Sequence, residues 1–328
     1  MLSTTKPLPA YIERGGEQVL RQPYRLTGTQ LRGFALPSDP AALRGVCDRY
    51  LNALSQDGTE YHPILPYSIL TFVQMPHIQS ADPQERDRGI LFENEADLWL
   101  LLVAGKRHAG VFVAERLVWF IPYLWVDNPI AMVEGREVYG FPKEFGQFQL
   151  PLTTQDPAYF SADTYVVDTF GPDSRWQMKR LIEVRRQDEP LWGEHPNEWS
   201  EFGHMVQGLQ ETLLTGAEAI SLPGPGLIAD LLHQVTHHQQ SLVFLKQFRD
   251  VGNSREACYQ SLIEAPVTLE SFQGGGLLAG DYDVTIHPYA SHPIALELGL
   301  AAGPQRASLA YWANFDFSFD LGHPVGRA

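Results

Sequence analysis

The chain has 328 residues, 44% of them hydrophobic, so it is long enough to bury a sizeable core and does not have the composition of a disordered chain. Its formal net charge of -15 would repel the phosphates of nucleic acids and anionic membrane surfaces, which argues against both as partners. The N-terminal stretch MLSTTKPLPAYIERGG has no apolar signal segment, and no apolar run is long enough to span a bilayer, so we expect a cytoplasmic protein.

The first part of the chain combines an extended arm with a helix. Residues 1–25 are rich in proline, glycine and charge, which is typical of an extended segment leading into a fold. Asp39 and Pro40 then form a capping residue followed by proline, and apolar residues continue at helical spacing. The pattern predicts a helix that ends near Asp57-Gly58.

The next segment, from Ile69 to Trp125, has the character of strands. The stretches SILTFVQM, ADLWLLLVA and AGVFVAERLVWFIPYLWV are dense in β-branched and aromatic residues and are separated by polar links. Short links favour an antiparallel meander over β-α-β units. Asn128-Pro129 then predicts the start of a short helix, and Lys143 is expected where the chain enters the following strand.

The remainder of the chain returns to strands after a helical interruption. Strands are expected around Tyr165 to Phe170 and Met178 to Arg185, followed by helical patterns over about 190–240. Strand-like segments follow in SLVFLKQFRD, EACYQSLIEAPVTLESF, YDVTIHPY and ASLAYWANFDFSF. We therefore predict a single domain over residues 1–328, of α+β class with a mainly antiparallel β core, peripheral helices and a helical insertion.

Motifs for metals and organic cofactors are weak. His233 and His237 have the i, i+4 spacing of a helical metal pair, but no third ligand accompanies them and a solvated helix face is the simpler interpretation. Cys47 and Cys258 share no metal-type spacing with a histidine. We expect neither a metal nor a cofactor.

Lys143 lies in the stretch GREVYGFPKEFG, between glycines and aromatic residues. A lysine amine attacks a carbonyl only when it is unprotonated, and its ordinary pKa near 10.4 leaves it charged at neutral pH. Burial or a neighbouring cation lowers this pKa. The apolar surroundings therefore suggest a lysine that forms a Schiff base, with a lysine lying along a strand edge as the alternative.

The segment LWVDNPIAMVEGREVYGFPKEFG resembles the acetoacetate decarboxylase family, in which the lysine after an aromatic-proline pair forms a Schiff base with the substrate. The matching positions are Asp127, Asn128, Gly135, Arg136, Glu137, Pro142 and Lys143. Weaker similarity extends to RQPY, to SDPAALR and to the C-terminal strands. The resemblance implies a closed, cone-like β-barrel core with peripheral helices, a homo-oligomer and no cofactor.

The chain also departs from the family pattern. The second lysine that decarboxylases carry after the nucleophile is Glu144 here, although consecutive strand residues point to opposite faces. The position of an active-site arginine falls near Thr29, with Arg32 as the nearest candidate, and a glutamate is replaced around Val73.

The resemblance implies a lyase that decarboxylates a small β-keto acid through an imine at Lys143, with Glu95 as general acid or base. An aldolase or dehydratase that uses the same lysine, and a non-catalytic protein that binds a small ligand, are the alternatives. We expect the substrate to be bound by the side chains of Glu93, Arg136, Tyr139, Phe141 and Glu144. For Arg136, a structural ion pair with Glu137 or a neighbouring strand is the competing role.

Overall fold

The computed structural model describes residues 8–12, 19–55, 57–151, 158–188, 198–201, 203–205 and 239–325. Within them the chain is mostly β-strand, and nearly all strand pairs are antiparallel. The expected antiparallel character is therefore confirmed. No helix in these ranges is both long enough and apolar enough to cross a membrane.

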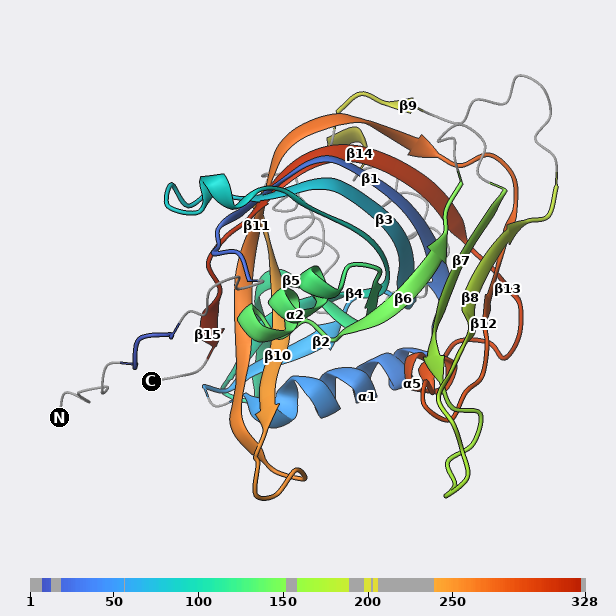
Figure 1. Cartoon of the computed structure of the whole chain (residues 1–328). Helices are drawn as coiled ribbons and strands as arrows, with labels where there is room; N and C mark the ends of the chain where they lie inside the picture. The colour runs from blue at the N-terminus through green and yellow to red at the C-terminus, as the bar shows by residue number, and fades with distance from the viewer. Residues whose placement is uncertain are drawn as a thin grey trace.

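Seven of the described strands pair in a ring (Figure 1). Their order is β5 (Val111–Val126), β10 (Gln239–Arg249), β11 (Ala257–Leu277), β14 (Leu309–Phe319), β1 (Tyr24–Pro37), β3 (Tyr67–Ser80) and β4 (Leu91–His108), and β4 pairs with β5 again. Only the contact between β5 and β10 is parallel in this ring. Three short strands extend it: β2 (Thr59–Pro63), β9 (Glu198–Trp199) and β15 (His323–Val325).

A second group of strands continues from the ring through β6 (Lys143–Gln149), which runs parallel to β5. From β6 the order is β7 (Tyr159–Val166), β8 (Gln177–Arg186), β12 (Tyr282–Ile286) and β13 (Gln305–Arg306), all antiparallel. The largest apolar core includes Phe34 of β1, Phe160 of β7 and Val184 of β8, so it joins the two groups of strands.

The helices begin where proline and a capping residue predicted them. Helix α1 (Pro40–Tyr50) is capped by Asp39, whose carboxylate accepts from the Ala41 N–H at 3.2 Å. It ends earlier than expected, and a 3-10 turn, η1 (Asn52–Leu54), follows it. Helix α2 (Pro129–Val138) is capped by the Asn128 side chain. The described helices also include η2 (Arg86–Arg88) and α5 (Ile294–Leu298), and residues 203–205 are helical as well.

The strands β3, β4 and β5 match the predicted meander; β3 and β4 are longer than the sequence pattern gave, and β5 begins two residues later. The pattern did not predict β1, whose polar and apolar residues do not alternate regularly because a register shift lies between Leu26 and Thr29. Strand β7 begins and ends earlier than expected. Most of the helical insertion near 190–240, with His233 and His237, lies outside the described residues.

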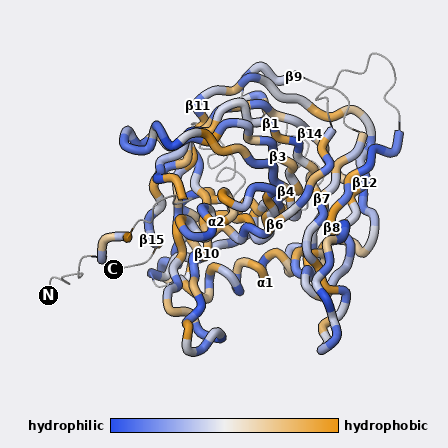
Figure 2. The backbone as a smooth tube through the Cα atoms, viewed as in Figure 1, coloured by the Kyte–Doolittle hydropathy of each residue, from blue (hydrophilic) through white to orange (hydrophobic). Residues whose placement is uncertain are grey.

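Hydrophobic segments gather on the strands around the centre of the molecule, and hydrophilic ones lie at the hairpin tips (Figure 2). A separate apolar cluster inside the ring includes Val73, Ile121 and Phe244. Helix α2 lies across this part of the ring (Figure 1). The ring and α2 together position the site described below.

Candidate active site

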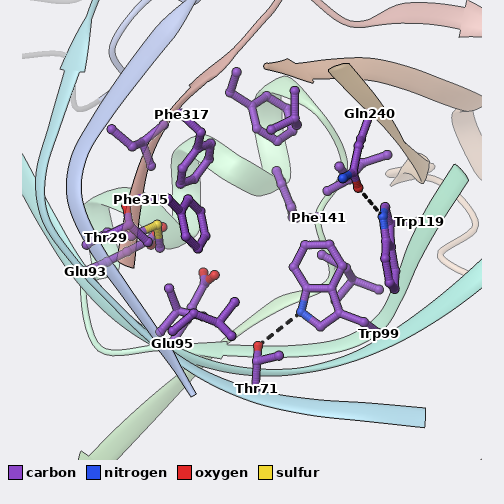
Figure 3. Close-up of a pocket in the computed structure, with 18 of the residues that line it drawn as sticks. Thr29, Thr71, Glu93, Glu95, Trp99, Trp119, Phe141, Gln240, Phe315 and Phe317 are labelled. Atoms are coloured by element: carbon purple, nitrogen blue, oxygen red, sulfur yellow. Dashed lines mark hydrogen bonds between the residues drawn. The ribbon is translucent and has the colours of Figure 1, made fainter. Parts of the chain in front are cut away.

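A cavity of about 350 Å³ is lined by residues from all seven strands of the ring, together with α2 and the start of β6. Alternate residues of a strand point to the same face, so each strand sends every second side chain into the cavity. On β4 these are Leu91, Glu93, Glu95, Trp99 and Leu101. Figure 3 shows that the walls are mainly aromatic and aliphatic, with a few polar side chains.

Lys143 is the first residue of β6 and lines this cavity with only 7% of its surface exposed. Helix α2 makes room for it at Gly135, where a Cβ atom would lie 2.8 Å from Lys143 Cδ and 3.4 Å from Nζ. The Arg136 guanidinium donates to the Lys143 carbonyl oxygen at 2.9 Å. The GREVYGFPK sequence therefore positions the lysine through one glycine gap and one backbone hydrogen bond.

The Lys143 amine forms a buried ion pair with Glu93. Nζ lies 2.9 Å from both carboxylate oxygens of Glu93, whose side chain is 5% exposed. The amine also lies 5.3 Å from the centre of the Phe141 ring. Removal of either partner would leave the other as an unpaired charge buried in an apolar cavity, which is costly.

The pKa of Lys143 is raised, contrary to the expectation that its surroundings lower it. Burial is the largest single influence and does lower this pKa, but the negative charges of Glu93, Glu95 and Glu134 together outweigh burial. No second lysine or arginine lines the cavity among the described residues. In the ligand-free protein Lys143 is therefore an ammonium.

Glu95 lies two residues beyond Glu93 on the same face of β4. Figure 3 shows its carboxyl group pointing into the cavity. Burial raises the pKa of Glu95 well above its ordinary value, and the negative charges of Asp97 and Glu93 raise it further. Glu95 therefore keeps its proton to higher pH than an ordinary glutamic acid, and it lies close to an amine.

Asp97 and Glu134 complete an acidic group around the lysine. Asp97 is fully buried and accepts a hydrogen bond from the Thr71 hydroxyl, and burial raises its pKa to about 7. Glu134 lies on α2 and lines the cavity, and burial raises its pKa to about 7 as well, partly offset by a hydrogen bond from Tyr24. No group of three His, Cys, Asp or Glu in the described part of the chain is arranged to hold a metal ion.

Tyr139 and Phe141 both line the cavity, as expected for residues that contact a ligand. The Tyr139 hydroxyl donates to the Asp320 carbonyl oxygen at 2.7 Å, so its ring and not its hydroxyl faces the cavity. Phe141 packs against Phe244 with ring centres 4.2 Å apart. These two aromatic residues form one wall beside the lysine.

Arg136 and Glu144, which we expected to bind substrate, do not line the cavity. The guanidinium of Arg136 is used by the Lys143 backbone, so this residue supports the lysine and does not face a ligand. The Glu144 side chain is 50% exposed and lies 3.0 Å from His292 Nε2. The reason is strand alternation: Lys143 points into the cavity, so Glu144 points to the opposite face.

The sequence departs from the family pattern around Thr29, Arg32 and Val73, and the structure shows where each of these residues lies. Thr29 lines the cavity, and its buried hydroxyl has no hydrogen-bond partner. Arg32 is buried but does not line the cavity, and burial lowers its pKa to about 10. Val73 lines the cavity between Thr71 and Met75. This face of β1 and β3 is therefore neutral.

Sequence reasoning did not identify Glu134 or Asp97. Glu134 directly precedes the GRE motif, and a helix residue next to a glycine that meets the lysine is a natural candidate. Asp97 lies at the i+2 position from Glu95, and strand alternation places both on one face. Nothing in the sequence indicated that α2 would bring Glu134 close to β4.

A family model described as acetoacetate decarboxylase (ADC) matches residues 107–164, which include α2 and Lys143. None of the curated proteins matches the sequence. The match confirms the resemblance to the acetoacetate decarboxylase family that the GREVYGFPKEFG segment suggested, over a limited part of the chain.

Solved structures show the same fold over nearly the whole chain. An acetoacetate decarboxylase from Legionella pneumophila superposes with a TM-score of 0.57 at 14% identity, covering 98% of this chain and 93% of that one. The enduracididine biosynthesis enzyme MppR, complexed with the condensation product of pyruvate and imidazole 4-carboxaldehyde, gives 0.53 at 16% identity and covers 98% of both chains. An acetoacetate decarboxylase-like enzyme from Sphingomonas wittichii gives 0.53 at 14% identity, covering 96% of this chain and 98% of that one. At these identities the likeness establishes the fold.

Proposed function

We propose that this protein is a lyase in which Lys143 forms an imine with the ketone of a keto acid, with decarboxylation of a β-keto acid as its reaction. The observation that carries the proposal is the Lys143 amine, buried in an apolar cavity and 2.9 Å from both oxygens of Glu93. A lysine held in this way has a proton acceptor in contact and a carbonyl-sized space beside it.

The reaction starts with deprotonation of the Lys143 amine. Transfer of a proton from Lys143 to the Glu93 carboxylate frees the amine, and burial, which penalises both charges of the ion pair, favours the neutral pair that results. The amine lone pair then attacks the ketone carbon and forms a carbinolamine. The protonated Glu95 carboxyl gives its proton to the carbinolamine hydroxyl, which leaves as water and leaves an iminium ion.

The iminium ion then accepts the electrons of the bond that breaks. In a β-keto acid the bond to the carboxylate breaks, carbon dioxide leaves, and the electron pair forms an enamine. A carboxyl group of the cavity protonates the enamine carbon, and water hydrolyses the resulting imine to release the ketone and the free lysine. The Glu95 carboxylate, left after its proton is given up, stabilises the positive iminium while it exists.

An aldolase or dehydratase using the same lysine is the second candidate. Glu95 and Glu134 both have raised pKa values and both line the cavity, which supplies the two acid-base groups that an aldol addition followed by loss of water requires. The condensation product bound to MppR is of this class. A non-catalytic binding protein is the third candidate, favoured by the raised pKa of Lys143.

We further propose that the ring of strands is the closed, cone-like barrel that the resemblance implies, and that the chain is a single domain that assembles as a cytoplasmic homo-oligomer. The ring of pairings from β5 round to β4 supports the first of these.

Reduction with borohydride in the presence of acetoacetate or pyruvate tests the imine. We expect a reduced adduct on Lys143, located by mass spectrometry, and none in Lys143→Arg, which keeps the charge but forms no imine. Lys246 is an internal comparison, because burial lowers its pKa and its amine donates to the Val138 carbonyl oxygen instead of lining the cavity. An adduct on Lys246 alone, or none with any keto acid, would refute the imine. Carbon dioxide release then separates decarboxylation from aldol chemistry.

A further inference from the structure

The cavity continues well beyond the reactive lysine. Its far part, which we call the apolar arm, is lined by Leu65, Ile69, Trp99, Leu101 and Trp119. The two tryptophan rings meet edge to face with their centres 5.8 Å apart (Figure 3). None of the described residues in this arm carries a charge.

The distance from the ion pair to the apolar arm can be estimated along β4. Glu93 marks the end where the lysine lies, and Trp99 lies six positions further on the same face of the strand. At roughly 3.3 Å per residue this places the tryptophan about 20 Å along the strand from the ion pair. A keto acid of three or four carbon atoms spans only the first part of this distance.

The polar groups at the arm are already satisfied within the protein. The Trp99 indole N–H donates to the Thr71 hydroxyl at 3.2 Å, and the Trp119 indole N–H donates to the Gln240 side-chain oxygen (Figure 3). Neither indole therefore offers a hydrogen bond to a ligand. A cavity with such walls favours ligands that bury apolar surface over those that need polar partners.

Charge also restricts which ligand groups can bind at the end of the cavity far from Lys143. Lys143 is the only lysine or arginine among the described residues that line the cavity, and Glu93 already neutralises it. A second carboxylate at the far end of a ligand would have no cation there, and burying an unpaired charge is costly.

From these observations we infer that the substrate is a keto compound with a long, uncharged, apolar tail, whose carbonyl meets Lys143 while its tail fills the apolar arm. This inference rests on the proposed imine at Lys143 and names its substrate class. It distinguishes this cavity from one suited to acetoacetate or pyruvate, because with so short a ligand the apolar arm would enclose unfilled space.

A series of straight-chain β-keto acids, from the four-carbon acetoacetate to a twelve-carbon acid, tests the inference by borohydride trapping at Lys143. Burial of one methylene is worth about 0.8 kcal/mol, or roughly a fourfold change in an equilibrium constant. We therefore expect the half-saturating concentration to fall about fourfold for each added methylene, until the arm is full. A half-saturating concentration independent of chain length, with acetoacetate still trapped, would overturn the inference and leave the imine intact.

Two matched variants locate the effect. Leu65 and Leu117 are both half-buried and pack against the same cluster formed by Ile64, Leu101 and Val103, but only Leu65 lines the cavity. Leu65→Trp should shorten the arm, so that the gain in affinity with chain length stops at a shorter acid than in the wild type. Leu117→Trp should leave the whole series unchanged. Equal effects of the two substitutions would contradict the assignment of the arm.

Straight-chain primary alcohols, which form no imine, separate failure of this inference from failure of the proposed reaction. Calorimetry should show affinity rising with their chain length in the wild type and less so in Leu65→Trp. If the alcohols bind in this way and no keto acid is trapped, the apolar arm stands and the imine does not. If the alcohols show no chain-length dependence, the apolar arm is not a ligand site.

Discussion

Gly135 and Lys143 are in such close contact that the helix leaves no room for a methyl group between them. A Cβ atom at residue 135 would lie 2.8 Å from Lys143 Cδ and 2.9 Å from Cε. The glycine therefore sets the path of the lysine side chain from β6 to Glu93.

Replacement of this glycine should displace the amine. In Gly135→Ala the new methyl group meets the Lys143 chain, and since a shift of about 1 Å in a reacting group costs about a hundredfold, we expect the rate of borohydride trapping to fall by one to two orders of magnitude. Gly45→Ala is the matched control, because Gly45 lies in α1 with nothing within 4 Å of its added Cβ. The control should gain up to about 1 kcal/mol in stability and keep its trapping rate. Equal trapping rates in both variants would contradict the role given to Gly135.

Removal of the Glu93 charge should lower the pKa of Lys143. Glu93 is the largest influence that raises this pKa, and burial, which lowers it, remains after Glu93→Gln. The pH dependence of trapping should therefore shift to lower pH, although the loss of the proton acceptor also slows the reaction. The loss of stability should be smaller than the ~3–5 kcal/mol typical of a broken buried pair, because the lysine can lose its proton.

Glu85→Gln controls for the removal of a buried carboxylate. Glu85 is 3% exposed, pairs with Arg88 at 2.8 Å and does not line the cavity. Its substitution should leave the pH dependence of trapping in place. If the pH dependence of trapping is also unchanged in Glu93→Gln, Glu93 does not control the charge of Lys143.

Glu134 should make the protein less stable as pH rises from about 4.5 to 7. Its pKa is raised by burial to about 7 in the folded chain, against about 4.3 for an unfolded glutamic acid. The folded chain therefore keeps a proton that the unfolded chain has lost, and this contribution decreases by up to about 1.4 kcal/mol per pH unit between about pH 4.5 and 7. When the free energy of unfolding is measured with urea at several pH values in this range, it should decrease less with pH in Glu134→Gln than in the wild type. The same dependence on pH in both proteins would rule out a buried, protonated Glu134.

Glu144 should be dispensable for the chemistry at Lys143. Its side chain is half exposed and lies 3.0 Å from His292 on the face away from the cavity. Glu144→Gln should leave the trapping rate unchanged, and the loss of one contact from a half-exposed side chain should cost no more than about 1 kcal/mol, measured by urea unfolding. A tenfold loss of trapping with stability intact would return Glu144 to the site.

Local sequence was sufficient where the signal lay within a few residues. Asp39-Pro40 and Asn128-Pro129 each fixed the start of a helix, because a capping side chain and a proline act on the turn that follows them. The alternation of a strand predicted that Lys143 and Glu144 point to opposite faces, and the structure confirms it. The segment around Lys143 also carried the family resemblance that the comparisons confirm.

The surroundings of the lysine were decided only by the tertiary structure. Glu93 precedes Lys143 by fifty residues, and the pairing of β4 with β5 and of β5 with β6 brings the two together. Glu134 reaches the same point from α2. Because the sign of a pKa shift depends on which charges lie within a few ångströms, the sequence determined that a lysine enters an apolar segment, whereas the fold determined that neighbouring glutamates, Glu93 above all, raise its pKa.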